Sequence, residues 1–154
     1  MIIWLTGQPG SGKTTMATKV FKMYSDWLQL DNVIHLDGDD VRDVLDNKDY
    51  SLEGRRKNIQ FAIDMARVLH EKDYIVICSF VSPYRDMREK LKEMSEVKEF
   101  YLHSTRELRK EYWVKDYEPP LENFKEIDTD KPIKECVDEI FDVYRKMATM
   151  AQRT

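Results

Sequence analysis

The sequence contains few residues that could form disulfides or bind zinc. It has only two cysteines, Cys78 and Cys136, and both lie in apolar segments without C-x-x-C spacing. A disulfide framework or a thiolate zinc site needs a larger or more closely spaced set of cysteines, so we expect both thiols to be reduced core residues. The three histidines show neither H-x-x-x-H nor H-E-x-x-H spacing. This pattern argues against a zinc site.

Long apolar runs and an excess of positive charge are also missing. No apolar run approaches the length of about 20 residues that crosses a bilayer. The formal net charge is -4 at pH 7, whereas proteins that coat nucleic acid through their overall field are basic. Met1 leads directly into an apolar segment, so we expect no signal peptide. These features favour a cytoplasmic enzyme that binds neither a membrane nor nucleic acid.

Glycine is scarce, and its positions reveal the first functional motif. Only five glycines occur in 154 residues, and three of them lie between residues 7 and 12. The segment from Gly7 to Thr14 has the spacing G-x-x-x-x-G-K-T of a phosphate-binding P-loop. An apolar run at residues 1–5 precedes it, and apolar residues at helical spacing follow in residues 14–24. Strand, glycine-rich loop and helix therefore occur in the order that a nucleoside triphosphate site requires.

Each residue type in this motif suits a triphosphate. Glycines let the backbone wrap around phosphates, and the backbone N–H groups and the helix N-terminus attract their negative charge. Lys13 supplies a cation, and the hydroxyl of Thr14 can ligate Mg²⁺. The residues of this loop that we expect to bind the nucleotide are Gly7, Gly10, Ser11, Gly12, Lys13, Thr14 and Thr15.

The chain alternates predicted strands and helices. Its 154 residues, 42% of them hydrophobic, suffice for one domain with a sizeable core, and we assign residues 1–154 to that domain. Alternation of this kind is typical of an α/β fold with a parallel sheet and helices on both faces. The carboxyl ends of the strands then share one edge, where such sheets bind ligands. Strands are predicted at residues 1–5, 32–36, 74–78 and 99–102, and helices at residues 14–24, 41–45, 55–71, 85–94, 105–113 and 133–150.

Acidic residues follow the second predicted strand at that edge. One carboxylate of the pair Asp37 and Asp39 can position Mg²⁺, and the other can accept the proton of an attacking hydroxyl. Asp40 is better explained as a helix N-cap. Together with the P-loop, these carboxylates predict phosphoryl transfer to a small molecule. Four arginines are candidate ligands for an anionic acceptor: Arg42, Arg55, Arg56 and Arg85.

Several motifs at this edge resemble those of adenylylsulfate kinase. The family pattern D-G-D-x-x-R matches residues 37–42, F-S-x-x-x-R-x-x-N-I matches residues 50–59, and F-I-S-P-Y-R matches residues 80–85. A Y-E-P-P…D-T segment matches residues 117–129. The resemblance covers most of the chain. It implies a P-loop kinase fold, ATP and Mg²⁺ as cofactors, and a small nucleotide as acceptor.

The resemblance also implies an activity and a role for each matching residue. Members of the family transfer the γ-phosphate of ATP to the ribose 3′-hydroxyl of adenosine 5′-phosphosulfate, a step of sulfate assimilation that gives 3′-phosphoadenosine 5′-phosphosulfate. By position, Asp39 and Lys13 would be catalytic, Asp37 and Thr14 would hold the metal, and Arg109 would contact ATP. Family members are often dimers, so the resemblance includes a homodimer as an assembly to test. The acceptor would be held by Asp39, Arg42, Arg55, Asn58, Phe80, Val81 and Ser82.

The chain departs from the family pattern in two places. Gln60 and Phe61 stand where the family has two arginines, and most of the family's long lid is missing between residues 102 and 117. Tyr112 and Trp113 are candidates to stack on the acceptor base in its place. Two alternatives therefore stay open. One is a related kinase whose acceptor is a different nucleotide with a modified phosphate, and the other is a P-loop switch or binding module without an acceptor.

Overall fold

A computed structural model describes residues 1–152, whose strands form one five-stranded parallel sheet. The strand order is β2-β3-β1-β4-β5, so β1, which leads into the P-loop, lies at the centre. The strands are β1 (Ile2–Thr6), β2 (Val33–Asp37), β3 (Ile75–Ser79), β4 (Val97–His103) and β5 (Phe124–Asp128). The helices are α1 (Lys13–Lys22), α2 (Gly38–Leu45), α3 (Leu52–Glu71), α4 (Arg85–Met94) and α5 (Ile133–Gln152), with a π-helical turn η1 (Met23–Trp27) and a 3-10 turn η2 (Lys110–Tyr112).

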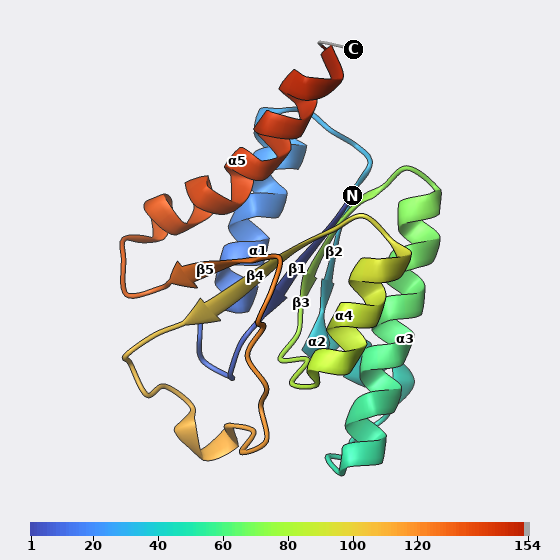
Figure 1. The fold of residues 1–154 in the computed structure, drawn as a ribbon, viewed down its shortest axis with the longest axis vertical. Coiled ribbons are helices and arrows are strands. Elements are labelled where there is room, and N and C mark those ends of the chain that lie inside the picture. Colours follow the sequence, from blue (N-terminus) through green and yellow to red (C-terminus); the bar gives the residue numbers. More distant parts are fainter. Residues whose placement is uncertain (153–154) are drawn as a thin grey trace.

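Both faces of the sheet are covered, as the near-continuous apolar character of β1 predicts. Ile3 and Leu5 point to the face that α1 and α5 cover. Ile2 and Trp4 alternate with them and point to the opposite face. Figure 1 shows α1 and α5 on one side of the sheet and α2, α3 and α4 on the other. The predicted α/β architecture with helices on both faces is therefore confirmed.

Local signals account for the helices that border the candidate site. The hydroxyl of Ser51 caps α3 by accepting from the N–H of Gly54 at 3.2 Å, and Ile59, Ile63 and Ala66 lie buried on one face of this helix. α2 begins at Gly38, earlier than expected. Its cap is the Asp37 side chain, which accepts from the Asp39 N–H, so the prediction that Asp40 is the N-cap is wrong. No helix within residues 1–152 combines the length and apolarity of a membrane span.

Two further elements differ from the sequence prediction. β5 was not expected, because its residues Phe124–Asp128 include only two apolar side chains and it lies at the sheet edge, with little of it buried. The helix predicted at residues 105–113 is absent except for η2. The backbone there follows tertiary hydrogen bonds instead: Asp130 accepts from Thr105, and Trp113 donates to Pro9. We call residues 104–123, between β4 and β5, the lid segment.

Candidate active site

The carboxyl ends of the strands open into one large cavity. Its volume is about 1140 Å³, and its walls come from the P-loop, the start of α2, the turn after β3 and the lid segment. Part of α3 and residues 129–133, which follow β5, complete the wall. In Figure 1 the lid segment and α2 lie beyond the arrowheads of the strands, at the edge where α/β sheets bind ligands.

The P-loop needs glycine where the chain is most crowded. Gly10 has a φ of +82°, and a Cβ atom there would lie 2.3 Å from the carbonyl oxygen of Leu108 in the lid segment. Gly12 precedes α1 with a φ of +97°, another left-handed conformation that glycine adopts readily. The loop therefore delivers the N-terminus of α1 to the cavity, where its N–H groups favour bound phosphate.

Lys13 is held inside the loop rather than in solvent. Its Nζ donates to the carbonyl oxygen of Gln8 at 2.8 Å and to the hydroxyl of Ser11 at 3.4 Å. Burial lowers the pKa of Lys13 to about 8, although the nearby Asp37 carboxylate opposes that effect. A pKa of about 8 keeps the amino group charged at pH 7, so a cation is available beside the phosphate-binding loop.

Asp37 is the centre of a hydrogen-bonded set that faces the P-loop. Its Oδ1 accepts from the Thr14 hydroxyl at 2.8 Å and from the Ser79 hydroxyl at 2.5 Å. Because Ser79 gives its only proton to Asp37, its oxygen accepts from Nε2–H of His35 at 2.7 Å. Burial lowers the pKa of His35, which suits this neutral tautomer. The carboxylate and the Thr14 hydroxyl are the hard oxygen donors that Mg²⁺ prefers, so these residues fit the metal.

Two unused hydrogen-bond donors mark the other end of the cavity. Within the described part of the chain, Nη1 of Arg42 and Nδ2 of Asn58 are buried without a hydrogen-bond partner. Both residues line the cavity, and the Arg42 guanidinium lies 4.8 Å from the centre of the Tyr50 ring. Arg55 lines the same end, 4.0 Å from the Asp116 carboxylate of the lid segment. Buried donors without partners are costly, and an anionic ligand would satisfy them.

The turn after β3 forms a rigid wall beside these donors. Phe80 stacks on Trp4 with ring centres 5.2 Å apart. Ser82 is 2% exposed, and its hydroxyl accepts from Nε1 of Trp4 at 2.9 Å and donates to Thr6 at 3.2 Å. Ser82 and Val81 both line the cavity, but the Ser82 hydroxyl is engaged behind the wall. The side-chain oxygen of Ser82, a predicted acceptor ligand, is therefore already hydrogen-bonded within the protein.

The lid segment is hydrogen-bonded to the P-loop. Nε1 of Trp113 donates to the carbonyl oxygen of Pro9 at 3.0 Å. The side chain of Gln8 bonds both the N–H and the carbonyl oxygen of Val114, each at 2.9 Å. Trp113 is thus placed against the P-loop by its indole N–H, and Arg109 lines the same part of the cavity.

Most residues that the sequence singled out come together here. Of the residues predicted to bind nucleotide, acceptor or metal, all line the cavity except Gly7, Ser11, Arg56 and Arg85. Arg56 pairs with Asp86 at 2.6 Å on the outer side of α3 and α4, and the Arg85 side chain contacts Glu118 and Pro119. His35, Ser79 and residues 129–133 were not assigned individual roles from the sequence. Thr129, in the D-T part of the family motif, was the one available signal for the last of these.

The two departures from the family pattern also have defined places. Gln60 is exposed and donates to Asp64 at 2.9 Å. Phe61 packs against the apolar core under α3. Neither side chain lines the cavity, so these two positions contribute no residue to its walls.

Comparison with known proteins gives consistent matches. The family model for adenylylsulphate kinase matches residues 1–118. A probable adenylyl-sulfate kinase of Bacillus subtilis (strain 168) is 40% identical over 102 residues, which cover 64% of this chain and 50% of that protein. A probable adenylyl-sulfate kinase of Pyrococcus abyssi (strain GE5 / Orsay) is 38% identical over 109 residues, covering 70% and 62%.

A solved structure extends the likeness to nearly the whole chain. The Mycobacterium tuberculosis APS kinase CysC, determined in complex with AMPPNP and APS, superposes with a TM-score of 0.79 at 19% identity and covers 94% of this chain and 96% of that one. At this identity the likeness concerns the fold. The matched part of the chain spans about half the length of the Bacillus subtilis relative.

Proposed function

This chain belongs to the adenylylsulphate kinase family, and we propose that it transfers the γ-phosphate of ATP to the ribose 3′-hydroxyl of adenosine 5′-phosphosulfate. Residues 1–154 would act as one kinase domain. The observation that carries the proposal is that one cavity joins the P-loop to buried donors of Arg42 and Asn58 that have no hydrogen-bond partner among residues 1–152. A phosphate chain at one end and a sulfated phosphate at the other would satisfy both sets of donors.

The donor side of the cavity would bind ATP. The N-terminus of α1 and Lys13 would hold the β- and γ-phosphates, with Arg109 near the nucleotide. Thr14 and Asp37 would hold Mg²⁺, which would supply positive charge to offset that of the phosphate groups. His35 and Ser79 would keep the Asp37 carboxylate oriented toward the P-loop.

The acceptor side would bring the ribose 3′-hydroxyl to the γ-phosphate. Asp39 lines the same cavity as the P-loop and Arg42 and would accept the hydroxyl proton. The hydroxyl oxygen would form a bond to the γ-phosphorus as the bond to the β–γ bridging oxygen breaks, leaving ADP. Arg42, Arg55 and Asn58 would hold the anionic end of the acceptor.

A second candidate is a related kinase that phosphorylates a different nucleotide with a modified phosphate. The observation that favours it is the short lid segment, which covers the cavity with residues 106–114 only. A short lid segment restricts the shape of the acceptor less than a long lid would.

The test is ADP release from ATP and Mg²⁺ with and without adenosine 5′-phosphosulfate. We expect strong stimulation by this acceptor and little by adenosine 5′-phosphate, which lacks the sulfate group. Stimulation by another nucleotide instead would favour the second candidate. Slow ADP release that no acceptor changes would contradict both and support a P-loop switch.

A further inference from the structure

Arg88 carries a positive charge that is buried outside the cavity. It lies on α4, is 1% exposed, and does not line the cavity. A buried guanidinium is unfavourable unless every donor is paired. Nε of Arg88 donates to Oε2 of Glu99 on β4 at 2.9 Å. The same guanidinium lies 5.6 Å from the centre of the Tyr117 ring.

The two terminal nitrogens of Arg88 donate to two different segments. Nη1 donates to the carbonyl oxygen of Ser82 at 2.5 Å, in the turn after β3. Nη2 donates to the carbonyl oxygen of Glu118, in the second half of the lid segment. The planar guanidinium presents these donors in a fixed geometry, so it fixes the two carbonyl groups relative to one another.

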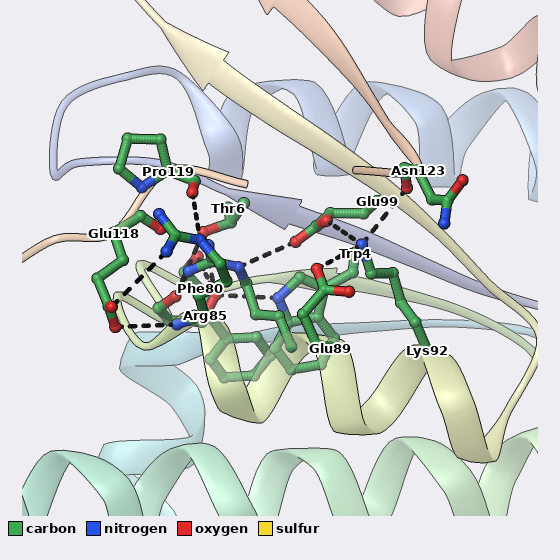
Figure 2. Close-up of polar contacts among 12 residues, drawn as sticks. Trp4, Thr6, Phe80, Arg85, Glu89, Lys92, Glu99, Glu118, Pro119 and Asn123 are labelled. Atoms are coloured by element: carbon green, nitrogen blue, oxygen red, sulfur yellow. Dashed lines mark hydrogen bonds and ion pairs between the residues drawn. The ribbon is translucent and has the colours of Figure 1, made fainter. Parts of the chain in front are cut away.

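The two segments also bond directly at this junction. The N–H of Glu118 donates to the carbonyl oxygen of Pro83 at 2.9 Å. From the outer side, Arg85 donates through its N–H to the Glu118 carboxylate at 3.2 Å and through Nε to the carbonyl oxygen of Pro119 at 2.9 Å. Figure 2 shows Arg85, Glu118 and Pro119 grouped on one side of this cluster. Residues 82–85 of the S-P-Y-R motif thus contact residues 117–120 of the Y-E-P-P motif, and we call this set of contacts the junction.

A second cation anchors the far end of the lid segment to the same carboxylate. Nζ of Lys92 contacts Oε1 of Glu99 at 2.8 Å and donates to the carbonyl oxygen of Glu122 at 2.9 Å. Figure 2 shows Lys92 between Glu99 and Asn123, apart from Glu118. Lys92 therefore shares the partner of Arg88 without touching the turn after β3.

The turn that Arg88 holds has an unfavourable backbone conformation. Ser82 has a φ of +36°, which is uncommon for a residue other than glycine. Such a conformation persists where several contacts impose it. Here these contacts are the Arg88 bond to the carbonyl oxygen and the Trp4 bond to the hydroxyl.

We propose that Arg88 is a positioning residue for the acceptor, and this inference rests on the proposed kinase function. By fixing the turn after β3 to Glu118 of the lid segment, it sets the separation of two cavity walls. Phe80 to Pro83 line one wall, and Glu111 to Val114 line the wall that the lid segment provides. The P-loop end of the cavity has its own contacts to the lid segment through Gln8 and Trp113. Loss of Arg88 therefore affects acceptor binding more than ATP binding.

The first test is Arg88→Lys, compared with the matched control Lys92→Met. Lysine keeps a charge beside Glu99, but one ammonium group cannot replace the fork to Ser82 and Glu118, so we expect the acceptor KM to rise about 10-fold or more. The KM of ATP should change less than about 2-fold, as should both KM values in Lys92→Met. Equal rises for ATP and acceptor, or the same profile in both variants, would overturn the proposal.

A measurement without nucleotide separates this inference from the proposed function. The Glu118 amide bonds Pro83, so its hydrogen exchange should be about 10-fold faster in Arg88→Lys and unchanged in Lys92→Met. An unchanged exchange rate of the Glu118 amide in Arg88→Lys would contradict the claim that Arg88 stabilises the junction, whether or not an acceptor is found. Faster exchange with an unchanged acceptor KM would overturn the positioning role.

Arg85→Met provides a second variant in case Arg88→Lys does not fold. It loosens the same junction from the partly exposed side, where the Glu118 carboxylate can be solvated. We expect a smaller rise in the acceptor KM in the same direction, with ATP KM unchanged. No rise in this variant would count against the junction.

Discussion

The amino group of Lys13 lies inside the P-loop, where it donates to the carbonyl oxygen of Gln8. Replacement by alanine removes the cation from the phosphate-binding end, so Lys13→Ala should lower kcat by about 1,000-fold. Steady-state kinetics with saturating ATP would measure this. Lys19→Ala, on the exposed face of the same helix, is the control and should keep wild-type turnover. Turnover near the wild-type level in Lys13→Ala would refute the P-loop assignment.

Asp39 and Asp40 are adjacent exposed carboxylates, but only Asp39 lines the cavity. Asp39→Asn removes the proposed base without changing the size of the side chain. It should lower kcat by about 100-fold to 10,000-fold while the Kd of ATP stays within about 2-fold. Asp40→Asn should behave like the wild type. Steady-state kinetics would give kcat for the two variants, and ATP titration would give the Kd. Equal losses of kcat in Asp39→Asn and Asp40→Asn would contradict the catalytic role of Asp39.

Arg42 has a buried Nη1 without a hydrogen-bond partner among the described residues. If this atom binds the acceptor anion, Arg42→Ala should raise the acceptor KM about 10- to 100-fold, the range expected for a charged hydrogen bond. The KM of ATP should stay nearly constant. Lys57→Ala, at an exposed pair with Glu53 on the same helix as Asn58, is the control. An equal rise in the KM of ATP and the KM of the acceptor would show that Arg42 supports the folded structure rather than the acceptor.

The lid segment begins at a set of hydrogen bonds to Asp130. Bonds from the Ser104 hydroxyl and from Thr105 lower the pKa of Asp130 to about 2, against an ordinary value of 3.8. A lowered pKa in the folded state means that the carboxylate stabilises the fold above pH 3.8 and that this contribution is lost as the pH falls toward 2.

Asp130→Asn should therefore unfold at a lower urea concentration than the wild type at pH 7, with a smaller difference at pH 3. Asp31→Asn, in an exposed turn, is the control and should show no such dependence. A difference of the same size at both pH values would show that Asp130 acts through packing rather than through its charge.

The sequence predicted the elements that carry their own apolar pattern. β1, β2, β3 and β4 were all expected, because each contains a short run of mostly apolar residues. β5 has the composition of a solvent-facing segment and is a strand because it pairs with β4 at the sheet edge. Residues 105–113 were predicted to be helical, but Thr105 donates to Asp130 and Trp113 donates to Pro9, and these bonds hold the backbone in another path. Contacts between segments distant in sequence cannot be found from local pattern.

The same distinction applies to the site. The P-loop and the acidic turn after β2 were predictable, since spacing and strand ends are local properties. Ser79 and His35 could not be assigned, because their link to Asp37 depends on the register of β2 with β3, which places Asp37 opposite Ser79. The engaged hydroxyl of Ser82 likewise follows from β1, whose Trp4 lies beside it.

The molecule as a whole places the proposed nucleotide and acceptor sites in one cavity that the lid segment borders. This segment contacts the P-loop through Trp113 and the turn after β3 through Glu118. One continuous piece of chain therefore connects the proposed nucleotide site to the proposed acceptor site. This arrangement suits the transfer of a phosphoryl group between two ligands that are bound at the same time.

The most direct test of that account is the position of the transferred phosphate. The protein would be incubated with ATP, Mg²⁺ and adenosine 5′-phosphosulfate, and the products examined by phosphorus NMR and mass spectrometry. We expect one new phosphate on the ribose 3′-oxygen, with one ADP formed for each. Release of inorganic phosphate with the acceptor unchanged, or phosphate at another position, would contradict it.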